Sequence, residues 1–147
     1  MEKSVEAEAL DMLTAGNMSE HEVSSRYSAL SLAFIGDSIY DLKVKTFFVK
    51  RSNAKVESYH KKVSSVVSAD SQSRFIESIL DELREDELAV YKRARNSSPH
   101  TKAKNATLGD YLKATGFEAL LGYLYLSGQS ERLDELVVRS LQFHEVI

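Results

Sequence analysis

The sequence predicts an all-α fold, a compact bundle of six or seven helices, and three observations support this class. Apolar residues recur at intervals of three and four along nearly the whole chain, which is the helical period. Alternation with the period of a strand is nowhere sustained. With only 6 glycines and 1 proline in 147 residues, few positions interrupt a helix. The length fits one domain that can bury its own core.

Composition excludes several classes of protein. The absence of cysteine rules out thiolate metal sites, cysteine nucleophiles and a disulfide-stapled secreted fold. No apolar run approaches the roughly 18 residues of a transmembrane helix, and the acidic start MEKSVEAEAL lacks the apolar core of a signal peptide. We therefore expect a cytoplasmic protein without a membrane partner. The net charge of −3 means that nucleic-acid binding would need a local basic patch.

Helix starts are marked along the first third of the chain. Ser19 with Glu22 three residues later is a capping-box signal, and Ser28 is a second start. We therefore expect residues 1–27 to form an extension or a first helix and residues 28–147 to form the main domain. The helix after Ser28 carries an apolar stripe at Leu32, Ile35, Ile39 and Leu42.

The middle of the chain predicts two more helices. The first covers about residues 53–67, with these residues facing inward: Val56, Tyr59, Val63 and Val67. Ser68 can cap the second helix, which holds Phe75, Ile76, Ile79 and Leu83.

The last third predicts three helices around one loop. Residues 84–96 carry acids in the first turn and bases in the last, the order that the helix dipole favours. The loop NSSPHTKAKNA follows. Thr107 with Asp110 opens a helix that runs to residues 127–128. Ser130 is expected to cap a final amphipathic helix through Leu133, Leu136, Val137 and Leu141.

Two carboxylates stand out because each interrupts an apolar helical stretch. Asp37 lies within LAFIGDSIYDL, directly after Gly36, a residue that lowers helix stability by about 1 kcal/mol and therefore indicates a close approach there. Glu118, within GFEALLGYLYLSG, is the only charged residue between Lys113 and Glu131. Each alone could be a surface carboxylate on a narrow polar face. Two of them on apolar helices, each beside a small residue, fit a divalent-cation site in a helical bundle.

A basic run at residues 92–104, KRARNSSPHTKAK, contains five lysines and arginines and no acid. Such side chains suit a phosphate backbone, and a second short basic run lies near His60. A solvated surface is an equally good explanation of a charge run. The candidate RNA contacts are His60, Lys61, Arg93, Arg95, Asn96, Lys102 and Lys104.

These motifs resemble those of a known family. LAFIGDSIYDL is similar to the signature of the ribonuclease III catalytic domain, and ATGFEALLGYLYL is similar to its second acidic motif. KRARNSSPHTKAKN and YHKKVSSVVSADSQ resemble the basic loop and preceding helices of Mini-ribonuclease III, the small bacterial branch made of the catalytic domain alone. The resemblance covers about residues 28–136. It implies a ribonuclease III-like catalytic domain over residues 28–147 without a double-stranded-RNA-binding module.

The resemblance also implies a site and a reaction. Asp37 and Glu118 would be the catalytic, metal-binding carboxylates. The larger relatives carry further carboxylates where this chain has Leu30, Ala33 and Thr115, so the number of metal ions is left open. The implied enzyme uses Mg²⁺, with Mn²⁺ as a substitute, to cleave double-stranded RNA into products with 5′-phosphate and 3′-hydroxyl ends.

The implied partners are the precursor of 23S ribosomal RNA, a second copy of the chain, and a ribosomal protein as helper. A dimer would place one site on each strand of the duplex. We expect its interface on the signature helix and the segment after it, at Phe34, Ile35, Ile39, Tyr40, Phe47 and Phe48. Two alternatives stay open: a catalytically silent ribonuclease III-like domain that binds RNA, and a helical adaptor that does not.

Overall fold

The computed structural model describes residues 4–97 and 107–147, and in these ranges it contains eight α-helices, one 3₁₀ helix and no strand. The all-α prediction is confirmed, with more helices than expected. In chain order the elements are α1 (Val5–Leu13), α2 (Glu20–Arg26), α3 (Ala29–Arg51), α4 (Val56–Val67), α5 (Ala69–Ile79), η1 (Leu80–Glu82), α6 (Glu85–Arg95), α7 (Leu108–Leu126) and α8 (Ser130–Phe143).

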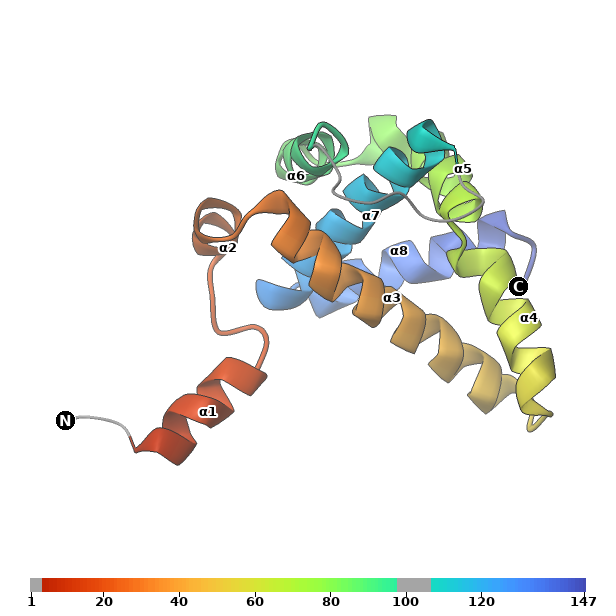
Figure 1. The fold of residues 1–147 in the computed structure, drawn as a ribbon, viewed down its shortest axis with the longest axis horizontal. Coiled ribbons are helices and arrows are strands. Elements are labelled where there is room, and N and C mark those ends of the chain that lie inside the picture. The colour runs from red at the N-terminus through yellow and green to blue at the C-terminus, as the bar shows by residue number, and fades with distance from the viewer. Residues whose placement is uncertain (1–3, 98–106) are drawn as a thin grey trace.

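Helix α7 is the centre of the bundle. It lies behind α3 in Figure 1 and packs against α3, α5, α6 and α8. From Ala114 to Leu124 every residue is buried except Glu118, because apolar or small side chains cover the whole circumference of the helix. Glu118 is therefore the one charged group within the buried part of this central helix, and a functional site can form around it.

Most of the predicted helix starts are confirmed. Four side chains accept a hydrogen bond from the backbone N–H three residues later: Ser19, Ser28, Ser68 and Thr107. The prediction for Ser130 was wrong, because Gln129 occupies the N-cap position of α8 and makes no side-chain capping bond. The helix after Ser68 is also shorter than expected, since it ends at Ile79 and continues as η1.

The predicted inward faces of two helices need correction. In α3 the buried positions include Leu32, Gly36 and Tyr40, whereas Leu42, part of the predicted stripe, is 58% exposed. Helix α4 begins at Val56 rather than near residue 53, and Val56 faces solvent. In α3 the buried positions recur every four residues through Leu32, Gly36 and Tyr40, so Leu42 falls on the opposite face of the helix.

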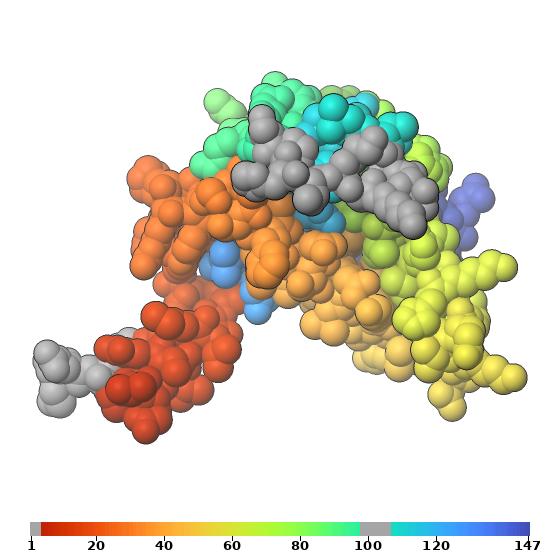
Figure 2. Space-filling view, in the orientation of Figure 1, coloured from red at the N-terminus to blue at the C-terminus, as the bar shows by residue number. Residues whose placement is uncertain are grey.

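Residues 4–26 lie at one side of the molecule. No residue of α1 is buried, and Figure 2 shows this helix standing out from the body of the protein. The connection to α2 is held by the Gly16 N–H, which donates to the Leu126 carbonyl at the end of α7. Within residues 4–97 and 107–147, no helix is both long enough and apolar enough to cross a membrane.

A buried ion pair joins α6 to α8. The side chain of Glu87, in the first turn of α6, is fully buried and accepts hydrogen bonds from Arg132 Nε at 2.8 Å and Nη2 at 2.9 Å. The Arg84 backbone N–H donates to the same carboxylate. Burial raises the pKa of Glu87, but the bonds from Arg132 and Arg84 outweigh it and hold this pKa below its usual value.

Arg132→Met is expected to lower the free energy of unfolding by about 3–5 kcal/mol, because the buried Glu87 carboxylate loses its bidentate partner and keeps only the weaker contacts of Arg84. Arg139→Met is a matched control on the same helix, since Arg139 pairs with Glu82 at the surface. Urea unfolding of both variants measures the difference. Equal losses would contradict the role given to the buried pair.

Candidate active site at the crossing of two helices

Two glycines allow α3 and α7 to touch through their backbones. An alanine Cβ at Gly36 would lie 1.7 Å from the Glu118 carbonyl oxygen, and one at Gly122 would lie 2.0 Å from the Leu32 carbonyl oxygen. Neither distance is physically accessible, so only glycine fits at both positions. The close approach that the sequence predicts at Gly36 is therefore confirmed, and it is a contact between two helix backbones.

This crossing brings Asp37 and Glu118 together. Asp37 follows Gly36 on α3, while Glu118 lies one turn before Gly122 on α7. The two carboxyl groups are hydrogen-bonded to each other. Asp37 is exposed and Glu118 is partly exposed, so an ion from solvent can reach the pair. The structure thus joins the two residues that the sequence singles out.

Glu118 holds its proton in the absence of a cation. Burial is the largest cause, followed by the hydrogen bond with Asp37 and the charge of Asp37, and together they raise the pKa of Glu118 to about 9. Glu118 is therefore protonated at neutral pH. A cation that binds both carboxylates must displace this proton.

The pair has a third partner that the sequence analysis missed. Gln72 of α5 donates through Nε2 to Glu118 Oε2 at 3.2 Å. Its side chain is only 2% exposed. The sequence could have indicated that Gln72 faces inward, because it lies at helical spacing from Phe75, Ile76 and Ile79 and so falls on the same face of α5.

No further acidic ligand joins the pair in the parts of the chain that are described. Those residues contain no group of three or more His, Cys, Asp or Glu side chains that could hold a metal. Ala33 is buried, Leu30 is half-buried, and the Thr115 hydroxyl donates to the Tyr111 carbonyl at 2.9 Å. The three positions at which the resemblance implied further carboxylates in larger relatives here serve packing and helix geometry.

Six of the seven predicted RNA contacts fall into three groups. His60 and Lys61 are exposed on α4 and are free to meet a ligand from solvent. Arg95 is half-buried and lies over the Tyr91 ring at 5.5 Å, with its Nε donating to Asn96 Oδ1. Lys102 and Lys104 lie outside the described residues.

Arg93 also has a structural role. It donates through Nη1 to the Ser24 carbonyl at 2.7 Å and through Nη2 to the Tyr27 carbonyl at 3.2 Å. These bonds join α6 to the carboxyl end of α2. A contact between Arg93 and RNA stays a prediction.

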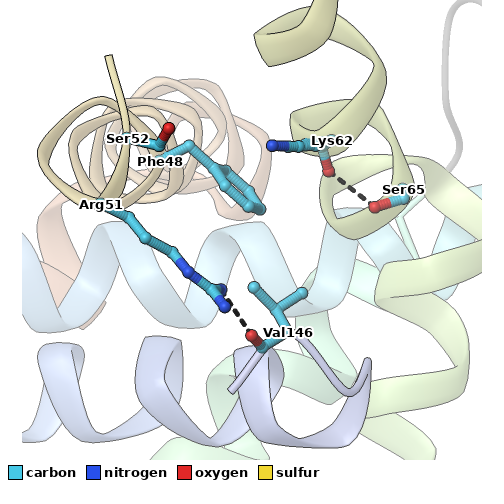
Figure 3. Close-up of a pocket in the computed structure, with 6 residues that line it drawn as sticks. All are labelled: Phe48, Arg51, Ser52, Lys62, Ser65 and Val146. Carbon is cyan, nitrogen blue, oxygen red and sulfur yellow. Dashed lines mark hydrogen bonds between the residues drawn. The ribbon is translucent and has the colours of Figure 1, made fainter. Parts of the chain in front are cut away.

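A separate cavity of about 310 Å³ lies where α3 ends, and Figure 3 shows its lining residues. The residues that line the cavity are Phe48, Arg51, Ser52, Lys62, Ser65 and Val146. None of them is a predicted catalytic, metal-binding or RNA-binding residue. Arg51 Nη1 donates to the Val146 carbonyl at 2.6 Å and so ties the C-terminal residues to α3.

Comparisons with known proteins show the family of this chain. Residues 30–129 match the Ribonuclease III domain family. The chain is similar to Mini-ribonuclease 3 of Clostridium tetani, with 44% identity over 79% of this chain and 78% of that one. Mini-ribonuclease 3 of Enterococcus faecalis is 41% identical over 75% of this chain and 85% of its own length. The chain belongs to the Mini-ribonuclease III branch of the ribonuclease III family.

The fold supports the same assignment. A crystal structure of a protein from Fusobacterium nucleatum matches this Mini-ribonuclease III chain with a TM-score of 0.73 and 29% identity, covering 79% of this chain and 93% of that one. Ribonuclease III proteins are endoribonucleases, and this protein is therefore an endoribonuclease. The family match begins at residue 30, just inside α3, and so leaves α1 and α2 outside it.

Proposed function

We propose that this Mini-ribonuclease III cleaves double-stranded RNA in a Mg²⁺-dependent reaction at the site formed by Asp37 and Glu118. The observation that carries the proposal is the carboxylate pair at the glycine crossing. Structural needs do not explain it, because placing two carboxyl groups against each other, one of them largely desolvated, is unfavourable unless a proton or a cation neutralises the charge.

The donor set fits Mg²⁺. This ion prefers oxygen ligands and is commonly held by one or two carboxylates together with water and substrate phosphates. Asp37 and Glu118 would hold it, and Mn²⁺ can substitute because it takes the same ligands. The bound ion supplies activation of water and neutralisation of charge on the scissile phosphate. The protein holds the two carboxylates in place through the helix crossing.

The proposed substrate is a paired segment of ribosomal RNA precursor, specifically that of 23S ribosomal RNA, with a ribosomal protein as helper. Support comes from the similarity to Mini-ribonuclease 3 proteins and from the exposed His60 and Lys61 on α4. Products would carry 5′-phosphate and 3′-hydroxyl ends.

The test is cleavage of a duplex RNA with Mg²⁺ and with chelator, beside a duplex-binding measurement. We expect cleavage with Mg²⁺ and none with chelator. Binding without cleavage in any divalent cation would instead identify a catalytically silent RNA-binding domain. The absence of both binding and cleavage would favour the alternative of a helical adaptor that does not bind RNA.

The pKa of Glu118 gives a test of the metal-free site. This carboxyl has a pKa of about 9 in the folded protein and about 4.5 in the unfolded chain, so unfolding at neutral pH releases its proton. Stability should therefore fall as the pH rises from neutral to about 9. Thermal unfolding in chelator should show this fall in the wild type and a flatter profile in Glu118→Gln. Parallel profiles would contradict the raised pKa of Glu118.

The proposal includes a homodimer, and α3 carries its best-placed apolar contact. Phe34 is 80% exposed, one turn before Asp37 on α3. Ile35, Ile39 and Phe47 are partly buried. Two members of the expected interface were wrong, because Tyr40 and Phe48 are buried within the chain's own core. An exposed phenylalanine beside a single cleavage centre supports pairing of two chains across a duplex.

Phe34→Asp should convert the dimer into monomers, because it places a charge in an apolar contact. Sedimentation at micromolar concentration should give twice the chain mass of 16.5 kDa for the wild type and the chain mass for the variant. Val138→Ser on α8, where Val138 is 43% exposed, is the control and should stay dimeric. A monomeric wild type would refute the dimer.

A further inference from the structure

We infer that Gln72 is a positioning residue for Glu118. This inference rests on the proposed metal-dependent function and names a residue that holds one of its two carboxylates. Gln72 belongs to α5, while Glu118 belongs to α7 and Asp37 to α3, so the site is built by three helices and not only by the two that cross.

The amide of Gln72 is fixed at two points. Its Nε2 donates to the Val67 carbonyl, at the last residue of α4, at 2.8 Å and to Glu118 Oε2 at 3.2 Å. The two N–H bonds of the amide group are thus both used. The side chain is 2% exposed and cannot rotate away without losing the bond to α4. One oxygen of Glu118 is thereby held in a defined position beside Asp37.

A simpler role for Gln72 is to cap α4, whose last carbonyl needs a donor. That role does not explain its other polar atom. Gln72 Oε1 is buried and has no hydrogen-bond donor among the described residues. Such atoms are rare in folded proteins and call for an explanation, which a role at a site provides. A methionine of the same length would fill the space without this unfavourable burial, so the amide is kept for what it contacts.

The contact resembles the outer shell of known metal sites, where hydrogen bonds orient the ligating groups. A carboxylate that can rotate presents its oxygens to the ion only part of the time. The donor from Gln72 restricts Glu118 to one orientation. Gln72 acts through Glu118, without contact with the substrate.

The experiment compares Gln72→Met with the wild type in two independent measurements. Electron paramagnetic resonance measures Mn²⁺ binding to the protein without RNA, and cleavage of duplex RNA is followed as Mg²⁺ is varied. We expect Mn²⁺ affinity to fall about 10- to 100-fold and the Mg²⁺ requirement to rise by a similar factor. Affinity for the duplex without divalent cation should stay the same. Ser73→Ala, a buried change on the same helix, should match the wild type throughout.

The outcomes separate this inference from the proposed function. A wild type that binds no Mn²⁺ and cleaves nothing in Mg²⁺ refutes the proposed function, and the inference about Gln72 with it. A wild type that does both, with Gln72→Met indistinguishable from it, leaves the function intact and reduces Gln72 to a cap of α4. Should Gln72→Met not fold, Gln72→Leu replaces it. Failure of both variants to fold would make Gln72 a structural residue and overturn the inference.

Discussion

Asp37→Asn and Glu118→Gln should each reduce cleavage of duplex RNA by about 10³-fold or more while the protein remains folded. Each variant keeps the shape of the side chain and removes a charge that binds the cation. A loss of about 4 kcal/mol in transition-state stabilisation, which is within the range of a metal ion's contribution, corresponds to this factor. Single-turnover cleavage at saturating RNA measures the chemical step apart from binding.

Asp41→Asn is the matched control for these variants. Asp41 lies one turn after Asp37 on α3, and its carboxylate pairs with Lys45 at 2.7 Å. It should cleave at close to the wild-type rate. If Asp37→Asn or Glu118→Gln cleaved as fast as Asp41→Asn, the assignment of the site would be wrong. Glu118→Gln should also raise the melting temperature of the metal-free protein at about pH 8, since it removes the desolvated carboxyl.

Gly36→Ala should destabilise the protein by about 3 kcal/mol or more. The new methyl group meets the Glu118 carbonyl oxygen, which belongs to the backbone of a central helix and cannot move aside as a side chain would. The two helices must separate, and the carboxylates separate with them. Urea unfolding and Mg²⁺-dependent cleavage should therefore both be impaired.

Gly109→Ala is the control for the glycine effect. It lies in the first turn of α7, and a Cβ there meets nothing within 4 Å. Alanine restricts the unfolded chain more than glycine does, so this variant should be more stable by about 0.4–1 kcal/mol. A Gly36→Ala protein as stable as Gly109→Ala would show that the helix crossing is looser than the structure indicates.

The sequence by itself determined the helical class, most helix starts and the two carboxylates. Helix starts could be predicted because a cap such as Ser28 is satisfied by a backbone N–H three residues away, so the cause lies within one turn of sequence. Asp37 and Glu118 could be identified because a charge within an apolar helical run is unfavourable in almost any fold. Gly36 could be interpreted for the same reason, since its cost to a helix is local.

Only the tertiary structure decided which partners these residues have. The sequence shows Arg93 only as part of a basic run. In the structure its guanidinium donates hydrogen bonds to backbone carbonyls that lie 66 and 69 residues away in sequence. Gln72 reaches Glu118 across 46 residues, and the protonation of Glu118 depends on Asp37 from another helix. Burial, hydrogen bonding and pKa are set by groups that are close in space, and spacing along one chain does not specify which distant helix will supply them.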